Sequence, residues 1–467
     1  MVGRQGSGFS RRALIGGGLG VAGVVAVGSG VAHASGGSGR RRGLGFLGAA
    51  MDGYPEHGSV RLAQSYSDQA GLFSTAFTYD NALAVLAQLA GRTAGGLGRA
   101  VVLGDALLYA QEHDPGYDDG RLRQAYNVGP YTFFDGSLQP DGFVRADGTA
   151  NVGTQFGFTG TAVGDMAWAG IALSALARRT GARRFLDGAV RIGAWIERDG
   201  RTDEPLGGYK FGVNGANEKL PFTSTEHNTD LVCLFGRLAL LTGDRVWRQR
   251  RARAEAFVEK MWEPDGGFFY TGTNDGVTVN KSPIPEDTQT WTHLALGSRP
   301  ESHSYSRSYS RSYSRSLDWA AVELAVVDHA GRRNSTVPTG QTYEGVTFSS
   351  ASLVANEDAP IAEFQPKPDR SGVWFEGTAH LALALRDRSR AGDEARARRL
   401  VASIERAQDL LGAGQTVGGR ALPERSGVVS ASSPLDTGFG FGYYPYRHVG
   451  ATAWYLLAAT RTNPLKA

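Results

Sequence analysis

Residues 224–262 read STEHNTDLVCLFGRLALLTGDRVWRQRRARAEAFVEKMW, and this stretch decides the fold. Apolar residues recur at i, i+3, i+4 and i+7, which predicts helices over residues 226–242 and 245–262, separated by the turn Gly243-Asp244. The first helix is rich in Leu, whereas the second contains many Arg and Glu residues. The stretch therefore predicts a hairpin in which a buried helix is followed by an amphipathic one.

The same unit recurs along the chain. Further turns stand at Gly181-Ala182 and Gly392-Asp393, and glycine-aromatic stretches at 206–212 and 265–272 repeat after about 60 residues. Helical periodicity predicts eleven helices, and a poorly marked one near residues 59–67 makes twelve, or six hairpins. The eleven cover residues 77–91, 97–111, 161–180, 184–197, 226–242, 245–262, 287–296, 317–329, 375–390, 394–411 and 447–460.

Six hairpins are the number that can close into a double ring. We therefore expect an all-α (α/α)6 toroid, with an inner circle of buried helices inside an amphipathic outer circle and short strands or turns in the loops. An open superhelix is the alternative, although such arrays normally show closer identity between repeats.

Four polar clusters stand directly before predicted inner helices. They are centred on Tyr79-Asp80, Glu226-His227, Trp374-Phe375-Glu376 and Tyr446-Arg447-His448. Helix capping and the helix dipole account for such residues one at a time. However, the outer helices 184–197, 245–262 and 394–411 begin with plain Arg or Glu, so we expect the clusters to line one shared pocket.

The first 34 residues resemble an export signal rather than part of the folded domain. Ser10-Arg11-Arg12, the glycine-rich apolar run 15–31 and Ala32-His33-Ala34 are typical of a twin-arginine signal peptide, with an uncleaved anchor as the alternative. We expect a secreted monomer with no membrane contact after cleavage, an extended segment over 35–58 and the toroid over 59–467.

Charge and cysteine content exclude other classes. Arg4, Arg11 and Arg12 are the only charged residues of the signal, so the net charge of +3 falls to zero without it, and we expect no nucleic-acid partner. The single cysteine, Cys233, lies in an apolar run and is interpreted as a core residue. A Ser-Tyr-Ser-Arg repeat within residues 301–316 is interpreted as a disordered insertion.

The order of these motifs resembles that of secreted bacterial proteins of the six-hairpin, (α/α)6-toroid glycosidase type. It is carried by residues 79–84, 224–230, 272–276, 287–291, 374–379 and 444–455, across essentially the whole mature chain. The resemblance implies a carbohydrate-active enzyme with its cleft over the N-termini of the inner helices. Asp165, in Asp-Met-Ala-Trp, stands where the pattern would have Asn.

Three carboxyl groups are the candidates for catalysis. Hydrolysis of a glycosidic bond needs a proton donor and a second carboxylate. Trp374 and Phe375 would desolvate Glu376 and keep it protonated, whereas the polar neighbours of Glu226 would keep it ionised. Asp80 is the third candidate. The alternative for all three is that an acid in the first turn of a helix only stabilises the helix dipole.

The candidate substrate-binding residues flank these carboxyls. Trp168, Trp291, Trp374 and Tyr446 are possible sugar platforms, since an aromatic face stacks on the C–H face of a pyranose, and a core position is the alternative for each. The other candidates are polar: Tyr79, Asp165, His227, Asp287, Arg447 and His448. Neither a metal nor a cofactor is expected, because no metal-binding or phosphate-binding motif is present.

The expected function is cleavage of an oligo- or polysaccharide by two carboxyl groups, with inversion of configuration. Carboxyl separations of about 6.5–9.5 Å would indicate inversion and about 5–5.5 Å retention. A lyase acting on a uronic-acid polymer through Tyr446, Arg447 and His448, and a glycan-binding toroid without turnover, are the alternatives. Sugar epimerases share the fold, but they are typically cytoplasmic, and the signal weighs against them.

Overall fold

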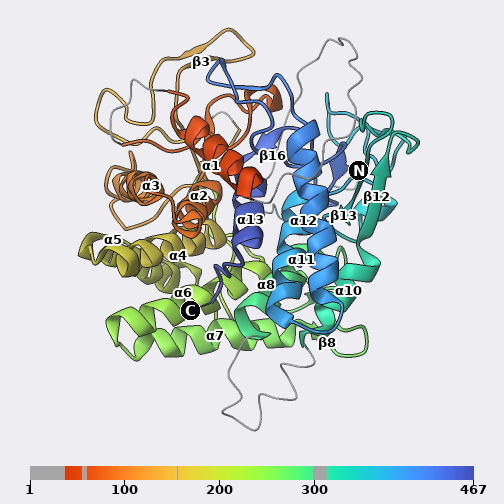
Figure 1. The fold of residues 1–467 in the computed structure, drawn as a ribbon. Helices are drawn as coiled ribbons and strands as arrows, with labels where there is room; N and C mark the ends of the chain where they lie inside the picture. Colours follow the sequence, from red (N-terminus) through yellow and green to blue (C-terminus); the bar gives the residue numbers. More distant parts are fainter. Residues whose placement is uncertain (1–36, 55–59, 155, 298–312, 467) are drawn as a thin grey trace, which may run out of the picture.

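The computed structural model describes residues 37–54, 60–154, 156–297 and 313–466. Twelve α-helices lie in this part of the chain, most of them in consecutive hairpins (Figure 1). Their bounds are α1 Gly37–Met51, α2 Thr78–Gly91, α3 Gly96–Glu112, α4 Val163–Thr180, α5 Arg183–Trp195, α6 Thr225–Thr242, α7 Val246–Lys260, α8 Glu286–Thr292, α10 Arg315–Glu323, α11 Phe375–Arg388, α12 Asp393–Leu410 and α13 Val449–Thr460.

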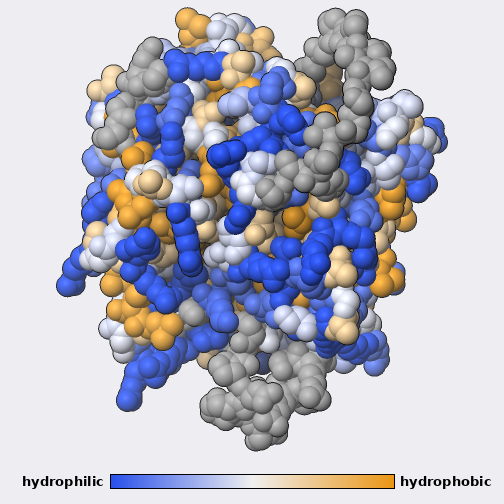
Figure 2. All heavy atoms as spheres, viewed as in Figure 1, coloured by the Kyte–Doolittle hydropathy of each residue, from blue (hydrophilic) through white to orange (hydrophobic). Residues whose placement is uncertain are grey.

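Six of these helices form a closed inner ring. In order around it, α2 contacts α4, α4 contacts α6, α6 contacts α8, α8 contacts α11, α11 contacts α13, and α13 returns to α2. Each inner helix also packs against one outer helix, which is α3, α5, α7, α10, α12 or α1. The predicted (α/α)6 toroid is confirmed. Figure 2 shows a largely hydrophilic face over α11 and α12, as expected for an outer amphipathic layer.

Three details of the prediction are wrong. The twelfth helix is α1, within the segment expected to be extended, whereas residues 60–67 form no helix. The helix expected over 317–329 ends at Glu323, because residues 325–329 form strand β12 and pair with β13. The end of the Ser-Tyr-Ser-Arg repeat is ordered, since Tyr313 packs on Trp262 and Phe269 and Arg315 begins α10.

Short strands and single bridges lie directly before the inner helices and fix the positions of their N-termini. The residue before each inner helix is extended, and it is Phe77, Ala162, Ser224, Pro285, Trp374 or His448. Four of these six residues end the strands β1, β5, β7 and β19, which pair with β2, β6, β10 and β16. Pro285 and Trp374 form single bridges to Ser349 and Ala431. All six N-termini are thus fastened to neighbouring loops.

The strands and minor helices are short. The strands are β1 Thr75–Phe77, β2 Ala125–Asn127, β3 Tyr131–Thr132, β4 Leu138–Gln139, β5 Thr161–Ala162, β6 Gly212–Val213, β7 Thr223–Ser224, β8 Trp262–Glu263, β9 Phe268–Phe269, β10 Gly272–Thr273, β11 Val279–Asn280, β12 Ala325–His329, β13 Thr342–Val346, β14 Thr416–Val417, β15 Arg420–Ala421, β16 Val428–Val429, β17 Leu435–Asp436, β18 Gly442–Tyr443 and β19 Arg447–His448. The described residues also form two 3₁₀ turns, Asp68–Ala70 and Ser352–Val354, and two π-helical turns, Ile196–Gly200 and His293–Gly297.

Cys233 is 1% exposed in the core, and burial raises the pKa of its thiol, so the core interpretation is confirmed. Among the described residues, no helix is long and apolar enough to cross a bilayer. The expected signal peptide and most of the expected insertion lie outside the described residues.

Candidate functional site

Acidic side chains gather at the end of the toroid where the inner helices begin. Five of the six inner helices carry an acid in the first turn, and the sixth, α13, follows His448. The helix dipole favours a negative charge at this end of a helix. The acids are Asp80, Asp165, Glu226, Glu286, Asp287 and Glu376.

Capping explains only part of this pattern. Ser224 caps α6 by accepting the His227 N–H, and His448 caps α13 by accepting the Ala451 N–H at 3.2 Å. The residues that precede α2 and α11 are Phe77 and Trp374, which offer no side-chain cap. Helix capping therefore does not account for the presence of Asp80 and Glu376 at these helix starts.

His448 joins Asp80 to Glu376. Its Nε2 lies 3.1 and 3.2 Å from the two carboxylate oxygens of Asp80, and its Nδ1 lies 3.5 Å from Glu376 Oε2. Because Nδ1 accepts the Ala451 N–H, the proton of a neutral imidazole is on Nε2, where it donates to Asp80. The structure thus brings together three of the predicted site residues, from three consecutive inner helices.

Gly450 makes room for this cluster. A Cβ at residue 450 would lie 2.7 Å from Asp80 Oδ1 and 2.9 Å from Glu376 Oε2, so these oxygens are at most about 5.6 Å apart. Gly450 thus lets two of the three predicted carboxyls approach each other, and the inverting separation of the catalytic pair stays a prediction.

Two residues that the sequence analysis missed extend the cluster. His380 Nδ1 lies 3.1 Å from Glu286 Oε2, and its Nε2 lies 3.8 Å from Glu376 Oε1. Glu286 is fully buried, and this burial, together with the charges of Asp287 and Glu376, raises its pKa well above the ordinary range. The i, i+4 spacing of Glu376 and His380 on one helix face was the signal available in the sequence.

Tyr79 links Glu376 to the core. Its hydroxyl donates to Glu376 Oε1 at 2.7 Å and accepts from Trp454 Nε1 at 2.9 Å. The Tyr79 ring packs edge-on against Trp168 and tilted against Trp291. The ring of Tyr79 thus packs in the core, and its hydroxyl forms a hydrogen bond with Glu376 of the cluster.

Glu226 lies in a different place from the other two predicted carboxyls. It lines an open hollow together with Asp287 of the neighbouring helix α8. We call this hollow the acid hollow. Its walls combine aromatic rings with hydroxyl and amide groups, among them Phe211, Phe222, Phe348, Phe439, Thr223 and Asn280. His227 packs against one of these rings, with its own ring 4.3 Å from that of Phe211.

The predicted aromatic platforms divide into two groups. Trp168, Trp291 and Trp374 are at most 1% exposed and pack against other aromatic rings, which matches the core alternative rather than a sugar platform. Tyr446 is partly exposed and lies beside Tyr444. Asp165 is buried in the first turn of α4.

Arg447 does not share a site with His448. Its Nη1 donates to Pro423 O at 2.8 Å and to Ser426 Oγ at 3.2 Å, and the side chain is 1% exposed. Successive residues of strand β19 point to opposite sides, which separates this guanidinium from the imidazole. Arg447 is therefore not placed to bind a substrate together with His448, as the lyase alternative requires.

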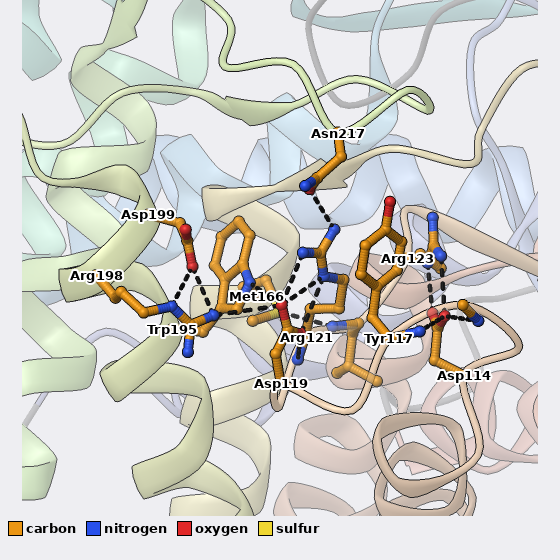
Figure 3. A network of polar contacts seen from close by, with 12 residues as sticks. Asp114, Tyr117, Asp119, Arg121, Arg123, Met166, Trp195, Arg198, Asp199 and Asn217 are labelled. Carbon is orange, nitrogen blue, oxygen red and sulfur yellow. Dashed lines mark hydrogen bonds and ion pairs between the residues drawn. The ribbon is translucent and has the colours of Figure 1, made fainter.

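A polar network holds the loop that precedes β2 (Figure 3). The Arg121 Nη2 and Asp119 Oδ2 atoms are 2.7 Å apart, and Arg121 Nη1 donates to Asn217 Oδ1 at 2.8 Å. Trp195 Nε1 also donates to Asp119. Burial would raise the pKa of Asp119, but the hydrogen bonds and charge of Arg121 outweigh it and lower that pKa. This network ties the loop to α5 and to the turn after β6.

No group of three or more His, Cys, Asp or Glu side chains within the described ranges is arranged to hold a metal ion.

No protein-family model and no curated protein sequence matches the chain. Solved structures do match in fold. A sugar epimerase from a ruminal bacterium is 10% identical with a TM-score of 0.57, over 90% of this chain and 98% of that one. A D-mannose isomerase is 12% identical with a TM-score of 0.57, over 92% and 96%. A family 76 glycoside hydrolase from a bovine Bacteroides thetaiotaomicron strain is 11% identical with a TM-score of 0.54, over 90% and 77%. The chain shares the (α/α)6-toroid fold with these structures.

Proposed function

We propose that this protein is a carbohydrate-active enzyme that hydrolyses a glycosidic bond in the acid hollow. One observation carries the proposal: Glu226 and Asp287 come from the first turns of adjacent inner helices and line one hollow with aromatic walls. Two carboxyl groups and aromatic faces are the chemistry that binding and cleaving a sugar requires. The similar folds of a glycoside hydrolase and of sugar epimerases support a carbohydrate substrate.

In this mechanism one carboxyl of the pair protonates the departing glycosidic oxygen. The other removes a proton from a water molecule as it attacks the anomeric carbon, so the products are two sugars. Packed helix axes are about 8–10 Å apart, which favours a separation in the inverting range for carboxyls on neighbouring helices. The proposal therefore includes inversion, and the anomer formed first, observed by NMR, tests it.

Asp80, His448 and Glu376 have a supporting role in this proposal. Glu286 connects them to the acid hollow, because it contacts His380 and its pKa responds to the charges of both Glu376 and Asp287. A cluster of this kind holds the neighbouring helix starts and their charges in fixed positions.

The test is an assay of a polysaccharide panel for new reducing ends and for unsaturated uronates. We expect reducing ends only, and a loss of about 10² to 10⁴ in rate for Glu226→Gln and for Asp287→Asn. Glu376→Gln is the matched comparison. A larger loss in Glu376→Gln than in Asp287→Asn would transfer the second catalytic role to Glu376, and full activity in Glu226→Gln would refute the assignment.

A second candidate function is sugar epimerisation or isomerisation. Its specific support is that His380 and His448 both lie within 4 Å of Glu376, since imidazoles are suited to moving a proton next to a carbonyl. Sugar epimerases and an isomerase also share the fold. This activity would change the identity of a sugar without adding reducing ends, and His380→Asn would abolish it. Binding without any conversion would instead support a glycan-binding toroid.

The proposal also includes export by the twin-arginine route, which makes the substrate an extracellular glycan, and a monomeric mature enzyme. Sequencing the N-terminus of the secreted protein and measuring its size by light scattering test these two points.

A further inference from the structure

Two more hollows continue from the acid hollow along the same end of the toroid. The middle hollow shares Phe211 and Phe222 with the acid hollow and adds Phe156 and Phe158. The far hollow is lined by Phe73 and Tyr131 among others. The Phe73 and Phe156 rings are stacked with centroids 5.9 Å apart, so an aromatic wall joins the middle hollow to the far one.

Each hollow also contains a buried hydroxyl that has no hydrogen-bond partner in the described part of the chain. These are Thr223 Oγ1 in the acid hollow, Thr161 Oγ1 in the middle hollow and Tyr131 Oη in the far hollow. Thr161 is 1% exposed and Thr223 is 2% exposed. A buried hydroxyl without a partner costs free energy, and a ligand that supplied a hydrogen bond to each of these three would offset that cost.

The charges along the path restrict the chemistry of that ligand. No described residue that lines the middle hollow is charged, and the far hollow contains one charge of each sign, Asp68 and Arg420. The acid hollow contains Glu226 and Asp287 but no Lys or Arg among its described lining residues, and this arrangement repels a carboxylate. Aromatic rings can stack on the C–H face of an uncharged sugar, and protein hydroxyl groups can form hydrogen bonds with the sugar hydroxyls.

The backbone at the far end is consistent with a binding role. Phe73 has a φ of 51°, a conformation that is costly for a bulky residue and is found mainly where the surroundings enforce it. This conformation places its ring among those of Tyr131, Phe133 and Phe156.

We propose that the three hollows form one path that binds an uncharged polysaccharide chain, with the acid hollow as its cleaving end. This inference rests on the proposed function and adds the substrate class to it: a neutral polymer at least several units long, rather than a free monosaccharide or a uronic-acid polymer. The polysaccharide passes over β5, and its successive sugar rings contact Phe211, Phe156 and Phe73.

The test compares binding of oligosaccharides of rising length. Calorimetry with neutral series from disaccharide to octasaccharide, prepared from mannan, xylan and starch, would identify a series whose affinity rises with length. Polygalacturonate oligomers of the same lengths are the charged comparison. Two variants address the middle hollow: Thr161→Val removes the hydroxyl without a partner, and Phe156→Ala removes the ring.

We expect each variant to weaken binding of the long chains about three- to tenfold and to leave disaccharide binding unchanged. The controls make the same chemical changes elsewhere. Thr347→Val removes another buried hydroxyl without a partner, and Phe364→Ala removes a ring that is 84% exposed, and neither residue lines the path. Both controls should bind every length as the wild type does.

Thr161→Val should also unfold at the same or a higher temperature than the wild type, because the lost hydroxyl has no partner. Wild-type affinity that does not rise with length, or unchanged long-chain binding in both path variants, would overturn the path while cleavage in the acid hollow remained. A wild-type protein that neither binds nor converts any sugar would instead overturn the proposed function itself.

Discussion

Replacing Asp369 by Asn should make the protein more stable in alkaline solution. Asp369 is 2% exposed and lies near Asp328, which is fully buried. Asp328 accepts hydrogen bonds from the hydroxyls of Ser335, Ser432 and Ser433 at 2.7, 2.5 and 2.6 Å, so its negative charge is well solvated by the protein. Asp369 Oδ1 accepts one backbone N–H, that of Ser371. Burial, followed by the charge of Asp328, raises the pKa of Asp369 to about 7.

The sign of the effect follows from linkage. Between about pH 4 and pH 7 the folded protein binds a proton at Asp369 that the unfolded chain has lost, so the free energy of unfolding falls as the pH rises through this window. A shift of about three pKa units corresponds to at most about 4 kcal/mol. Since solvent screening at the loop reduces this value, we expect about 2 kcal/mol. Asn has the shape and neutrality of the protonated acid, so the variant avoids this loss.

Urea unfolding followed by tryptophan fluorescence at about pH 4 and about pH 9 measures the difference. Asp369→Asn should come close to the wild type near pH 4 and exceed it by about 2 kcal/mol near pH 9. Asp118→Asn, at an exposed aspartate, is the control and should show no such divergence. If the unfolding free energies of Asp369→Asn and of the wild type change in the same way with pH across this range, Asp369 does not hold a proton at neutral pH.

Two further predictions concern the site and its supporting loop. Gly450→Ala should shift Asp80 and Glu376 by up to about 1 Å and lower the rate about 10²-fold, with an unfolding free energy within about 2 kcal/mol of wild type. Gly98→Ala, in open space on α3, should keep full activity, and an active Gly450→Ala would exclude the cluster from the reaction. Arg121→Ala should cost about 2–4 kcal/mol in urea unfolding, because its side chain is only 4% exposed. Arg184→Ala breaks an exposed pair and should cost at most about 1 kcal/mol, and equal costs would contradict the structural role of the network in Figure 3.

The hairpins were predictable because their determinants are local. The helix period of α6 and α7 and the turn at Gly243, which has a φ of 73°, can be read over 40 residues without knowledge of the rest of the chain. Helix α1 was missed for a physical reason. It packs on α13 through glycines, where a Cβ at Gly39 would lie 2.5 Å from Tyr455 Oη and one at Gly43 would lie 3.2 Å from Leu456. The first half of α1 has glycine and arginine in place of an apolar period, so no signal in the sequence marks the start of this helix.

Nonlocal pairing explains the other errors. Residues 325–329 continue a helical period, but they pair with β13, whose residues 342–346 come later in the chain. In the site, sequence correctly indicated Asp80, Glu376 and His448 at inner helix starts. It did not indicate that Glu226 lies in a separate hollow with Asp287, because that depends on the order of the helices around the ring.

The buried acids of the inner ring are difficult to explain by stability alone. Asp80, Glu286 and Glu376 are at most 1% exposed, and the dipole of each helix start contributes only about 0.3–1 kcal/mol to offset the cost of burying a charge. The raised pKa of Glu286 indicates that burial outweighs the dipole there. Apolar residues fill equivalent depths elsewhere in the ring, as Trp168 and Trp291 do, so the fold does not need carboxyls in these places. Acids retained at such a cost, on helix starts that converge on one rim, are better explained by chemistry than by folding.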